Sequence, residues 1–455
     1  MTLQVARTYD EVESFRPAWE RFQNDHLTSD LDFVLTYCRH TPNVVRPHAV
    51  LLENGNDPRG LLVGRVEDIR LPARLAHKTV LDSRFRALTI VYGGVLDGDD
   101  ATVSARLLGS LESTLADERV DLVRVRMLPR ASHRHAAAIA SVSSVRRQRF
   151  SPRMLHWRSE LPGSLDEFLA RRSRRRRETV RRYARRLERS YGDDVRVEVV
   201  RDRTGLERLF ADSKAIHRET YQHILGVGFS DEQVQRRLAE LGADHGWFRG
   251  YMLYLRDNPV AFWHGNAYRG IFGIGATGFD PAFSEDRPGT YLLMRAVDDL
   301  CADTSVHTLD FGFGDAAYKR NFGDGFVEEE DVVVFARKPR TVALNALQTA
   351  FGGVTAVARS AAARTGSLAD LRRRRRTGEP TGLLRSFLGG VLVLLAVYAA
   401  AGLAAGPASA RGPESTVFSE VVVDGARRVE SPAAKRRSLE ASEPRDGASP
   451  SPPRS

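Results

Sequence analysis

The clearest hydrophobic pattern lies in the second half of the chain. Across residues 289–302, directly after a proline, leucines and valines recur at the three- and four-residue spacing of an amphipathic helix. An apolar run at 308–311 predicts a short buried strand, and the glycine-containing segment 312–315 predicts a turn. A second short helix follows and carries Tyr318 and Lys319. This order of elements directs one helix N-terminus and several polar side chains toward a common cleft, and a helix N-terminus suits a phosphate.

The rest of the pattern predicts an α/β (α+β) protein with two units, each a mixed, mostly antiparallel sheet flanked by helices. In residues 1–162 it predicts helices at 9–24, 31–40 and 101–115 and strands at 48–52, 61–66, 88–91 and 120–126. In residues 193–338 it predicts strands at 195–200, 247–255, 260–268, 271–279 and 332–335, and helices at 204–220 and after a cap at 230–233. With 455 residues, 42% of them hydrophobic, the chain is long enough to bury two cores.

Residues 163–192 link the two units through an arginine-rich helix. Ser164 and Glu167 form a capping box at its start, and the helical pattern runs to Tyr191. From Arg171 to Arg189 the chain holds eleven arginines against two glutamates. A charge run of this kind is usually a solvated surface, but its density also indicates an anionic partner. That partner is an anionic membrane surface, a nucleotide-activated or polyanionic substrate, or tRNA, and the sequence does not choose among them.

The last quarter of the chain has a different composition. Residues 339–386 are rich in alanine and include five consecutive arginines, and twenty residues without a charge follow at 387–406. That length suits a membrane-spanning helix, and the arginines before it place the folded part of the chain in the cytoplasm. Residues 407–455, rich in Ser, Pro, Ala, Glu and Arg, predict a disordered tail. The sequence therefore predicts a protein anchored in a membrane by a C-terminal helix.

Charge and cysteine content change this picture little. The net charge of +10 comes from the two arginine segments, so the remainder of the chain is mildly acidic. Two cysteines, Cys38 and Cys301, are too few for a zinc site or a disulfide framework, which fits a reducing compartment. We expect no cleaved leader, and the sequence has no metal-binding cluster, nucleophile elbow or Walker loop.

One motif carries a family resemblance. The run from Asp310 to Lys319, DFGFGDAAYK, with a Pro-Gly pair before the preceding helix, resembles the GNAT acyltransferases. Within them it is most similar to the branch of FemAB-like transferases and cellulose-biosynthesis CelD-like proteins (BioF2-like acetyltransferase domain), over about the first three quarters of the chain. The resemblance implies tandem GNAT-like lobes, in which the N-terminal lobe lacks the Tyr-Lys motif and serves as a substrate-binding partner. It also implies that the glycine-rich strand 273–278 separates from its neighbour and pairs with the pantetheine arm of the donor.

Three residues are candidates for catalysis. Tyr318 falls where the family often has the tyrosine that protonates the departing thiolate, although a tyrosine packed in the wall of the site fits the same position. Asp310 and His264 are candidate bases. Asp310 is equally suited to cap a helix or to pair with Lys319, and a lone histidine among aromatic residues, such as His264, is more often a core residue than a catalyst. A water relay would need no single base.

Five residues are candidates for binding the phosphates of an acyl-CoA, most simply acetyl-CoA, which is the cofactor we expect as co-substrate. They are Arg287, Gly289, Thr290, Lys319 and Arg320. Lys319 and Arg320 are otherwise surface cations on a short helix. The family's pyrophosphate loop has the form Gln/Arg-x-x-Gly-x-Gly/Ala, whereas residues 287–291 of this chain contain a single glycine. We expect no metal in the reaction.

These observations predict an N- or O-acyltransferase that acts on a cell-envelope or polysaccharide precursor, with its catalytic lobes in the cytoplasm. A second hypothesis is FemAB-like aminoacyl transfer from charged tRNA, with the arginine-rich helix holding the RNA. A third is a non-catalytic GNAT-fold scaffold that binds anionic lipid or nucleic acid. The single-glycine loop favours the scaffold, and the retained Tyr318-Lys319 pair argues against it.

Overall fold

The computed structural model describes residues 1–364, except 76–77 and 221–228. The predicted membrane-spanning segment 387–406, the predicted tail 407–455 and the end of the segment 339–386 lie outside the described residues. Within the described residues, no helix has the length and apolar character needed to cross a bilayer.

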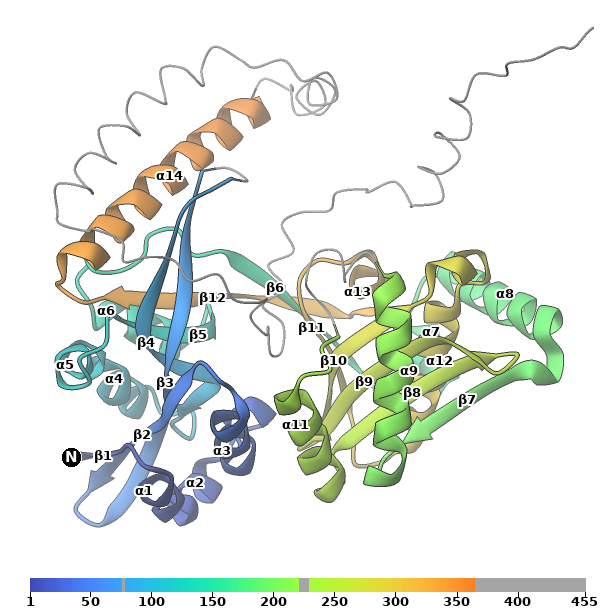
Figure 1. Cartoon of the computed structure of the whole chain (residues 1–455), viewed down its shortest axis with the longest axis horizontal. Helices are drawn as coiled ribbons and strands as arrows, with labels where there is room; N and C mark the ends of the chain where they lie inside the picture. The colour runs from blue at the N-terminus through green and yellow to red at the C-terminus, as the bar shows by residue number, and fades with distance from the viewer. Residues whose placement is uncertain (76–77, 221–228, 365–455) are drawn as a thin grey trace, which may run out of the picture. The chain divides into compact units, whose positions relative to one another are not determined.

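Twelve strands of the described chain form one mixed sheet in the order β1-β2-β3-β4-β5-β12-β6-β11-β10-β9-β8-β7 (Figure 1). The strands are β1 (Thr2–Ala6), β2 (Val44–Asn54), β3 (Asp57–Leu75), β4 (Lys78–Leu96), β5 (Leu122–Pro129), β6 (Arg153–Glu160), β7 (Val195–Val200), β8 (Phe248–Leu255), β9 (Asn258–Tyr268), β10 (Ile271–Phe279), β11 (Thr308–Phe313) and β12 (Gly325–Phe335). Neighbours pair antiparallel, except β4 with β5 and β10 with β11, which pair in parallel. The mixed, mostly antiparallel sheet is confirmed, but the expectation of a separate sheet in each lobe is wrong.

Two strands are exchanged between the halves of this sheet. Strands β1 to β5 form its N-terminal half and strands β7 to β11 its C-terminal half. Strand β6 follows the N-terminal half in sequence but pairs with β11, and β12 follows the C-terminal half but pairs with β5. β6 and β12 also pair with each other. The exchange covers the edge that each half would otherwise leave open, and it joins both halves through backbone hydrogen bonds.

Helices cover both faces of the sheet. They are α1 (Tyr9–Ser14), α2 (Arg16–Phe22), α3 (Leu31–His40), α4 (Ala101–Gly109), α5 (Leu111–Asp117), α6 (His133–Ala140), α7 (Leu165–Ala170), α8 (Arg174–Tyr191), α9 (Leu206–Glu219), α11 (Gln233–Asp244), α12 (Pro288–Ala302), α13 (Ala317–Phe322) and α14 (Pro339–Arg364), with short 3-10 helices η1 (Leu27–Ser29), η2 (Gly192–Asp194), η3 (Arg203–Gly205) and η4 (Pro281–Asp286). Successive side chains of β8 point to opposite faces of the sheet, so their contacts show which helices cover each face of the C-terminal half. Tyr251 and Leu253 pack with α7, α8 and α12, whereas Met252 and Tyr254 pack with α9 and α11. Figure 1 shows α9 crossing this half of the sheet.

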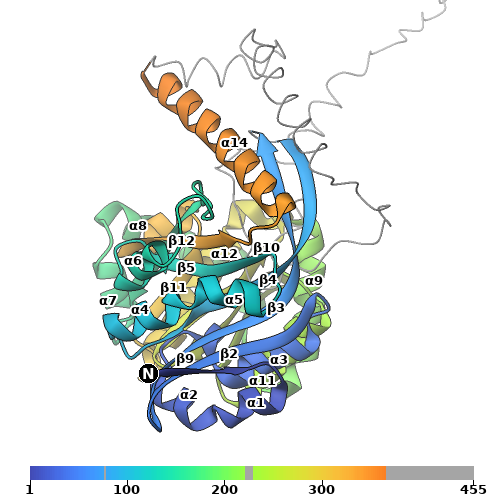
Figure 2. The same ribbon diagram turned by 90° about the vertical axis from the view of Figure 1, so that its left-hand side faces the viewer.

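Strands β3 and β4 are much longer than predicted, at 19 residues each. Beyond Glu67 in β3 and Ala87 in β4 they pair only with each other and form a two-stranded ribbon. Helix α14 packs on this ribbon through Leu344 and Leu347, which contact the cluster around Phe85 (Figure 2). The sequence pattern misses the ribbon because charged residues alternate along it and few apolar residues mark a buried face.

Most other predicted elements are confirmed with small changes of bounds, including α3, β7, β10, α12 and α13. A single helix through the arginine-rich segment is wrong, because the chain breaks between α7 and α8 and Ser173 caps the second helix by accepting from the Arg176 amide. The predicted helices 9–24 and 101–115 are likewise each divided in two. The predicted side-chain cap of the helix that follows residue 232 is absent. Strands β1 and β6 and helix α6 were not predicted.

Arg172 holds the break between α7 and α8 against the sheet. Its guanidinium is buried and donates to Ser159 Oγ at 2.7 Å, to the Phe322 carbonyl oxygen at 2.5 Å and to Asp324. We predict that Arg172→Met lowers the free energy of unfolding by about 2–3 kcal/mol, because buried acceptors lose their donor. Urea denaturation of the variant measures this loss.

The neighbouring Arg171 provides the matched control. Its guanidinium is exposed and pairs with Glu160 at 2.8 Å. Arg171→Met should change the free energy of unfolding by less than about 1 kcal/mol. Equal losses in the two variants would contradict the role given to Arg172.

Candidate active site

Strands β10 and β11 separate within the C-terminal half of the sheet. They pair in parallel over three residues that end at Gly273–Asp310, and they share no ladder beyond that pair. β10 continues to Phe279 with partly exposed residues. We call this point of divergence the fork. The separation of the glycine-rich strand from its neighbour, which the family resemblance implied, is thereby confirmed.

Gly312 lies at the base of the fork. Its φ of +68° is rarely adopted by residues with a side chain, and its amide donates to Asp310 Oδ1 at 2.7 Å. A Cβ atom at this position would lie 3.9 Å from Lys319 Nζ and 4.0 Å from the Ile274 carbonyl oxygen. An acid, an amine and the backbone of β10 therefore meet at the base of the fork.

Lys319 is buried at this base. The residue is 8% exposed, and its Nζ donates to the Phe313 carbonyl oxygen at 2.5 Å. Burial lowers the pKa of Lys319 to about 8, against the opposing effect of the Asp310 carboxylate. The amine is therefore mostly charged at neutral pH but can exchange a proton near pH 8. The alternative expectation of a surface cation at Lys319 is wrong.

The Asp310 carboxylate belongs to a buried cluster centred on His156. His156 Nε2 lies 2.6 Å from Asp310 Oδ1, and His156 Nδ1 lies 3.0 Å from Glu329 Oε1. Arg158 donates to Asp310 Oδ2 at 3.3 Å. The cluster joins β6, β11 and β12, the strands on which the exchange between the two halves depends. Asp310 pairs with His156 and Arg158, and its proposed pairing with Lys319 is not present among the ion pairs of the described residues.

The two carboxylates fix the charge of the histidine between them. Burial alone would lower the pKa of His156, but the hydrogen bonds to Asp310 and Glu329 raise it to about 9. Burial likewise acts to raise the pKa of Asp310, and the contacts with His156, Arg158 and the Gly312 amide lower it overall. At neutral pH the cluster thus holds an imidazolium next to an ionised Asp310. An Asp310 carboxylate stabilised in this way is a weak base, and its contacts suit it to hold the fork.

The N-terminal half adds Tyr92 and His26 to the cluster. Tyr92 Oη lies 3.0 Å from His156 Nδ1 and 3.4 Å from Glu329 Oε1, and the His26 and Tyr92 ring centroids are 4.3 Å apart. Burial and the nearby carboxylates raise the pKa of Tyr92 well above its usual range, whereas burial lowers that of His26 to about 4. Glu329 Oε2 is buried with no hydrogen-bond partner. Among the described residues the cluster therefore has one carboxylate oxygen without a hydrogen-bond partner, and Tyr92 and His26 border the cluster from the N-terminal half.

The other predicted catalytic residues lie outside this cluster. The Tyr318 ring is 6.1 Å from that of Phe311, which faces the core shared with α12, on the opposite side of β11 from Asp310. His264 lies among the rings of Phe210, Phe229, Phe248 and Phe262, with Nε2 2.8 Å from Ser213 Oγ. Burial lowers the pKa of His264 to about 3. Its surroundings are those of a neutral core histidine.

The first turn of α12 leaves one backbone N–H group open. Arg287 precedes the helix with φ 55°, and the turn has neither a side-chain cap nor an acidic residue. Pro288 has no N–H, and the amides of Thr290 and Tyr291 donate to the Arg287 carbonyl oxygen at 3.0 and 3.2 Å. The Gly289 amide has no acceptor among the described residues. With the exposed Arg287 beside it, this helix start can receive an anion.

Strand β10 connects this helix start to the fork. A Cβ atom at Gly289 would lie 3.4 Å from the ring of Phe279, the last residue of β10. From Ile274 at the fork to Phe279, β10 spans about 17 Å. An extended pantetheine arm can bridge such a distance, with its phosphates at one end and its thioester at the other. Of the predicted phosphate ligands, Lys319 lies at the fork, and the exposed Arg320 pairs with Asp315 at 2.6 Å.

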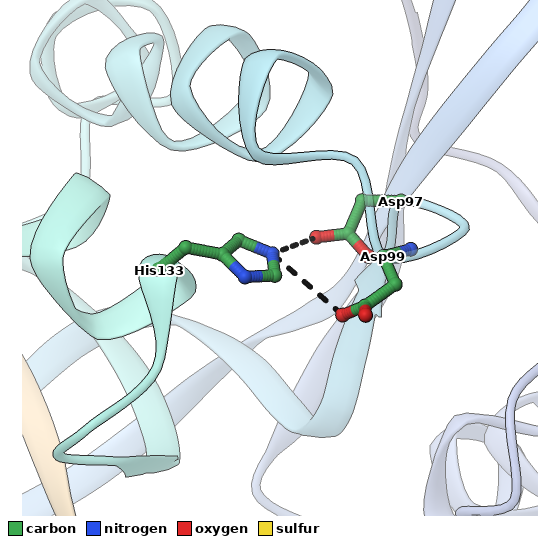
Figure 3. Close-up of side chains that lie close together, drawn as sticks. All are labelled: Asp97, Asp99 and His133. Atoms are coloured by element: carbon green, nitrogen blue, oxygen red, sulfur yellow. Dashed lines mark hydrogen bonds and ion pairs between the residues drawn. The ribbon is translucent and has the colours of Figure 1, made fainter.

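The equivalent helix of the N-terminal half, α4, is closed to an anion. Its N-cap residue Asp100 accepts from the Thr102 and Val103 amides at 2.7 and 3.2 Å. Asp97 and Asp99 lie in the same turn, with His133 facing them (Figure 3). Carboxylates at a helix N-terminus occupy its amides and repel a phosphate. Of these two helix starts, that of α12 is therefore the one left open to an anion.

Asp97, Asp99 and His133 also offer possible metal-ligand atoms within 4.8 Å of one another. Arg134 already donates to both oxygens of Asp97, at 2.5 and 2.9 Å. The Asp99 side chain is largely exposed. This arrangement is that of an ion-paired turn, and nothing in it calls for a metal.

His156, Glu329 and Tyr92 were not among the residues predicted for the site. His156 and Arg158 alternate with apolar residues, which is a strand signal, but β6 was not predicted. Glu329 lies in an acidic run, Glu328 to Asp331, that looks solvated in sequence although Glu329 is 3% exposed. Only the pairing of distant strands brings these residues together.

The raised pKa of His156 predicts a pH-dependent stability. Because its pKa rises from 6.5 to about 9 on folding, the stabilisation is complete below pH 6.5 and is lost as the pH rises through 9. We expect it to reach at most about 3 kcal/mol. Urea denaturation between pH 6.5 and 9 should show His156→Gln lacking this loss of stability, whereas the distant His40→Gln keeps the wild-type slope. Parallel slopes for wild type and His156→Gln would exclude the charged imidazolium.

Both the sequence and the fold were compared with those of known proteins. Residues 174–320 match the family model described as the acetyltransferase (GNAT) domain. The structure of FemX is similar with a TM-score of 0.51 and 12% identity, over 74% of this chain and 98% of that chain. No curated protein matches the sequence at a significant level.

Two further solved structures are similar at lower TM-scores. A tandem GNAT protein from the clavulanic acid biosynthesis pathway has a TM-score of 0.45 and 10% identity, over 73% of this chain and 98% of that chain. The C-terminal domain of a putative lysylphosphatidylglycerol synthetase from Agrobacterium fabrum has a TM-score of 0.44 and 12% identity, over 72% and 92%. The match of residues 174–320 to an acetyltransferase (GNAT) domain supports an acyltransferase, and the likeness to FemX shows a shared fold.

Proposed function

We propose that the chain transfers an acyl group, most simply acetyl from acetyl-CoA, to an amine or hydroxyl of a cell-envelope or polysaccharide precursor. The observation that carries this proposal is the fork between β10 and β11, with Lys319 at its base and the open start of α12 at the far end of β10. Strand β10 links these features, since it leaves the fork at Gly273 and ends at Phe279 next to Gly289. They match the three parts of an acyl-CoA: thioester, extended arm and phosphates.

The donor binds along β10 in this account. Beyond Gly273 the strand has no hydrogen-bonding partner from β11, so its backbone can pair with the amides of the pantetheine arm. The phosphates then reach the Gly289 amide and the Arg287 guanidinium. The single glycine in this loop is sufficient, because Gly289 is where the phosphate must approach the backbone closely.

Lys319 stabilises the developing negative charge at the thioester and serves as the proton donor there. Transfer forms a bond from the acceptor nitrogen or oxygen to the acyl carbon and breaks the bond from that carbon to sulfur. The ammonium of Lys319 stabilises the oxyanion and gives its proton to the departing sulfur, and the proton released by the acceptor restores it. A pKa of about 8 lies close to that of a thiol and suits this exchange.

The acceptor approaches from the side of the N-terminal half. Tyr92 contacts His156 and Glu329 from this half, and the His26 ring packs against Tyr92, so these side chains can supply polar groups to an N–H or O–H group of the acceptor. Glycans and aminated envelope precursors present such groups. The proposal includes an envelope acceptor, CelD-like chemistry and a cytoplasmic position of the catalytic part. All three agree with the membrane-spanning segment predicted at 387–406.

Calorimetric titration of acetyl-CoA into the full chain tests the donor site. We predict micromolar binding that Gly289→Asp weakens about tenfold, because the new carboxylate sits where the phosphates bind. The substitution reproduces the acidic start of α4 and suits a helix N-terminus, so folding is preserved. Gly109→Asp, at an exposed position with open space around it, should bind acetyl-CoA like wild type. Binding of charged tRNA without binding of acetyl-CoA would favour aminoacyl transfer, and binding of neither would favour the scaffold.

Kinetics of Lys319 variants test the chemistry. With acetyl-CoA and a panel of amino sugars as acceptors, Lys319→Met should lower kcat at least about 100-fold and leave the KM for acetyl-CoA within a few-fold of wild type. The wild-type kcat should fall above about pH 8 as the ammonium loses its proton. Lys319→Arg should keep part of the activity without this fall, because a guanidinium stays charged.

The exposed Arg320, which pairs with Asp315, provides the control for these kinetics. Arg320→Met should keep kcat within about twofold, since it removes a cation one residue away that does not reach the fork. Similar losses in Lys319→Met and Arg320→Met would contradict the role of Lys319.

A further inference from the structure

Helix α8 carries a dense positive charge that the acyltransferase site does not explain. Its eighteen residues include nine arginines, no lysine and two glutamates, Glu178 and Glu188. Over this length the helix is about 27 Å long. The charge is therefore concentrated on one rigid element of the described structure.

The apolar side of α8 is fully used inside the protein. Val180 and Leu187 are buried in the core that α8 shares with α12, and Ala184 and Tyr191 pack against the same core. Arg295 of α12 pairs with Glu188 at 2.9 Å and fixes the helix in this orientation. Figure 1 shows α8 next to α7 at the outside of the C-terminal half. The remaining surface of α8 is basic and turned away from the core.

About half of these arginines are bound within the protein. Arg174 pairs with Glu178 at 2.7 Å and Arg181 with Asp166 at 2.8 Å. Arg176 donates to Asn321, and Arg177 donates to the Arg172 carbonyl oxygen at 2.6 Å. These four side chains stabilise the α7–α8 region and are not available to a partner.

The other five have no acidic partner among the described residues. They are Arg175, Arg182, Arg185, Arg186 and Arg189, all exposed. Three acids of this element and its neighbours are already engaged: Glu178 by Arg174, Glu188 by Arg295, and Asp286 by the Tyr191 hydroxyl at 2.8 Å. Arg287, which is also exposed, extends the surface, with its guanidinium carbon 5.8 Å from the Tyr183 ring centroid. An uncompensated cationic surface of this size needs anions near it.

We propose that this surface of α8 binds the anionic headgroups of a lipid bilayer, with the helix lying along the membrane surface. A line of guanidinium groups on one straight helix presents its charges to a flat array of phosphates. Because the apolar side is buried in the protein, the contact is electrostatic and does not involve insertion into the acyl chains. The inference goes beyond the proposed reaction and does not depend on it.

Nucleic acid is the less favoured partner. Single-stranded RNA is held largely by stacking of bases on exposed aromatic rings. The aromatic residues of α8 are Tyr183 and Tyr191, which are half-buried, and the guanidinium groups of Arg287 and Arg256 lie over their rings. The surface therefore offers phosphate contacts without a stacking platform, which is the chemistry of a lipid headgroup layer.

The expected strength follows from the number of free charges. Each arginine near an anionic surface contributes about fivefold in binding, and added salt screens the contribution. Replacing Arg182, Arg185, Arg186 and Arg189 by Gln should therefore weaken binding at least about 100-fold. Binding by wild type should fall steeply between 50 and 500 mM salt. Over this range the Debye length shrinks from about 14 to about 4 Å, so the attraction between the arginines and the headgroups is screened.

The experiment uses the full chain with vesicles of phosphatidylcholine alone or with about one third phosphatidylglycerol, and with deacylated tRNA as a second probe. Vesicles of phosphatidylcholine alone measure the binding that does not depend on anionic headgroups. The control variant replaces Arg196, Arg201, Arg203 and Arg237 by Gln. Those four are exposed on the same half and paired with acids, so the net charge changes equally. Thermal unfolding verifies that both variants fold.

A local readout separates α8 from any other contact with the bilayer. A donor dye at Ser190→Cys reports energy transfer to headgroup-labelled lipid, because Ser190 follows Arg189, which has no acidic partner among the described residues and donates only to the Arg185 carbonyl oxygen at 3.2 Å. The native Cys38 and Cys301 are buried and do not compete for the dye. We expect stronger transfer with phosphatidylglycerol than without it in wild type and in the control variant, and no such increase in the α8 variant.

Three results would overturn the proposal. The first is equal loss of phosphatidylglycerol binding in both variants, which would mean that net charge alone is responsible. The second is unchanged vesicle binding and energy transfer in the α8 variant. The third is tRNA binding that depends on the four arginines while phosphatidylglycerol binding does not, which would assign the surface to RNA.

Discussion

The imidazolium of His156 between Asp310 and Glu329 is the interaction on which the structure depends most. His156 lies on β6, the strand that follows the N-terminal half but pairs with β11, and Glu329 lies on β12, which makes the reciprocal crossing. Without a positive charge between them, two buried carboxylates would destabilise the seam. The same contacts orient the Asp310 carboxylate, which accepts a hydrogen bond from the Gly312 amide at the base of the fork. The seam between the halves and the shape of the site are therefore held by one charged cluster.

The two halves share an arrangement of strands but differ in electrostatics. In each, a parallel pair of strands is connected through helical structure that includes a comparable helix, α4 (followed by α5) between β4 and β5 and α12 between β10 and β11. Asp100 caps α4 with Asp97 and Asp99 close by, whereas α12 begins at an uncapped turn beside Arg287. A few side chains at two helix starts are enough to give the halves different roles. In our proposal one half binds the acyl donor, and the other supplies Tyr92 and His26 on the acceptor side.

The local parts of this arrangement could be predicted from sequence, and the long-range parts could not. The helix after Pro288, the turn at Gly312 and the short helix with Lys319 each follow from spacing and turn chemistry within some thirty residues. The burial of Lys319 was not predictable, because it depends on how α13 folds back on β11. His156 and Glu329 are 173 positions apart and meet only through the strand exchange, which no local periodicity encodes. His264 was a reasonable candidate by residue type, but its aromatic surroundings exist only in three dimensions.

The central claim is that the acyl donor lies along β10, from the fork to the start of α12. Amide hydrogen exchange of the full chain, measured with and without saturating acetyl-CoA, tests it most directly, because it reports each segment of backbone separately. The account predicts slower exchange in residues 274–279 and 289–292 and unchanged exchange at the start of α4, residues 101–104. Protection at α4, or saturated binding without protection in β10, would contradict it.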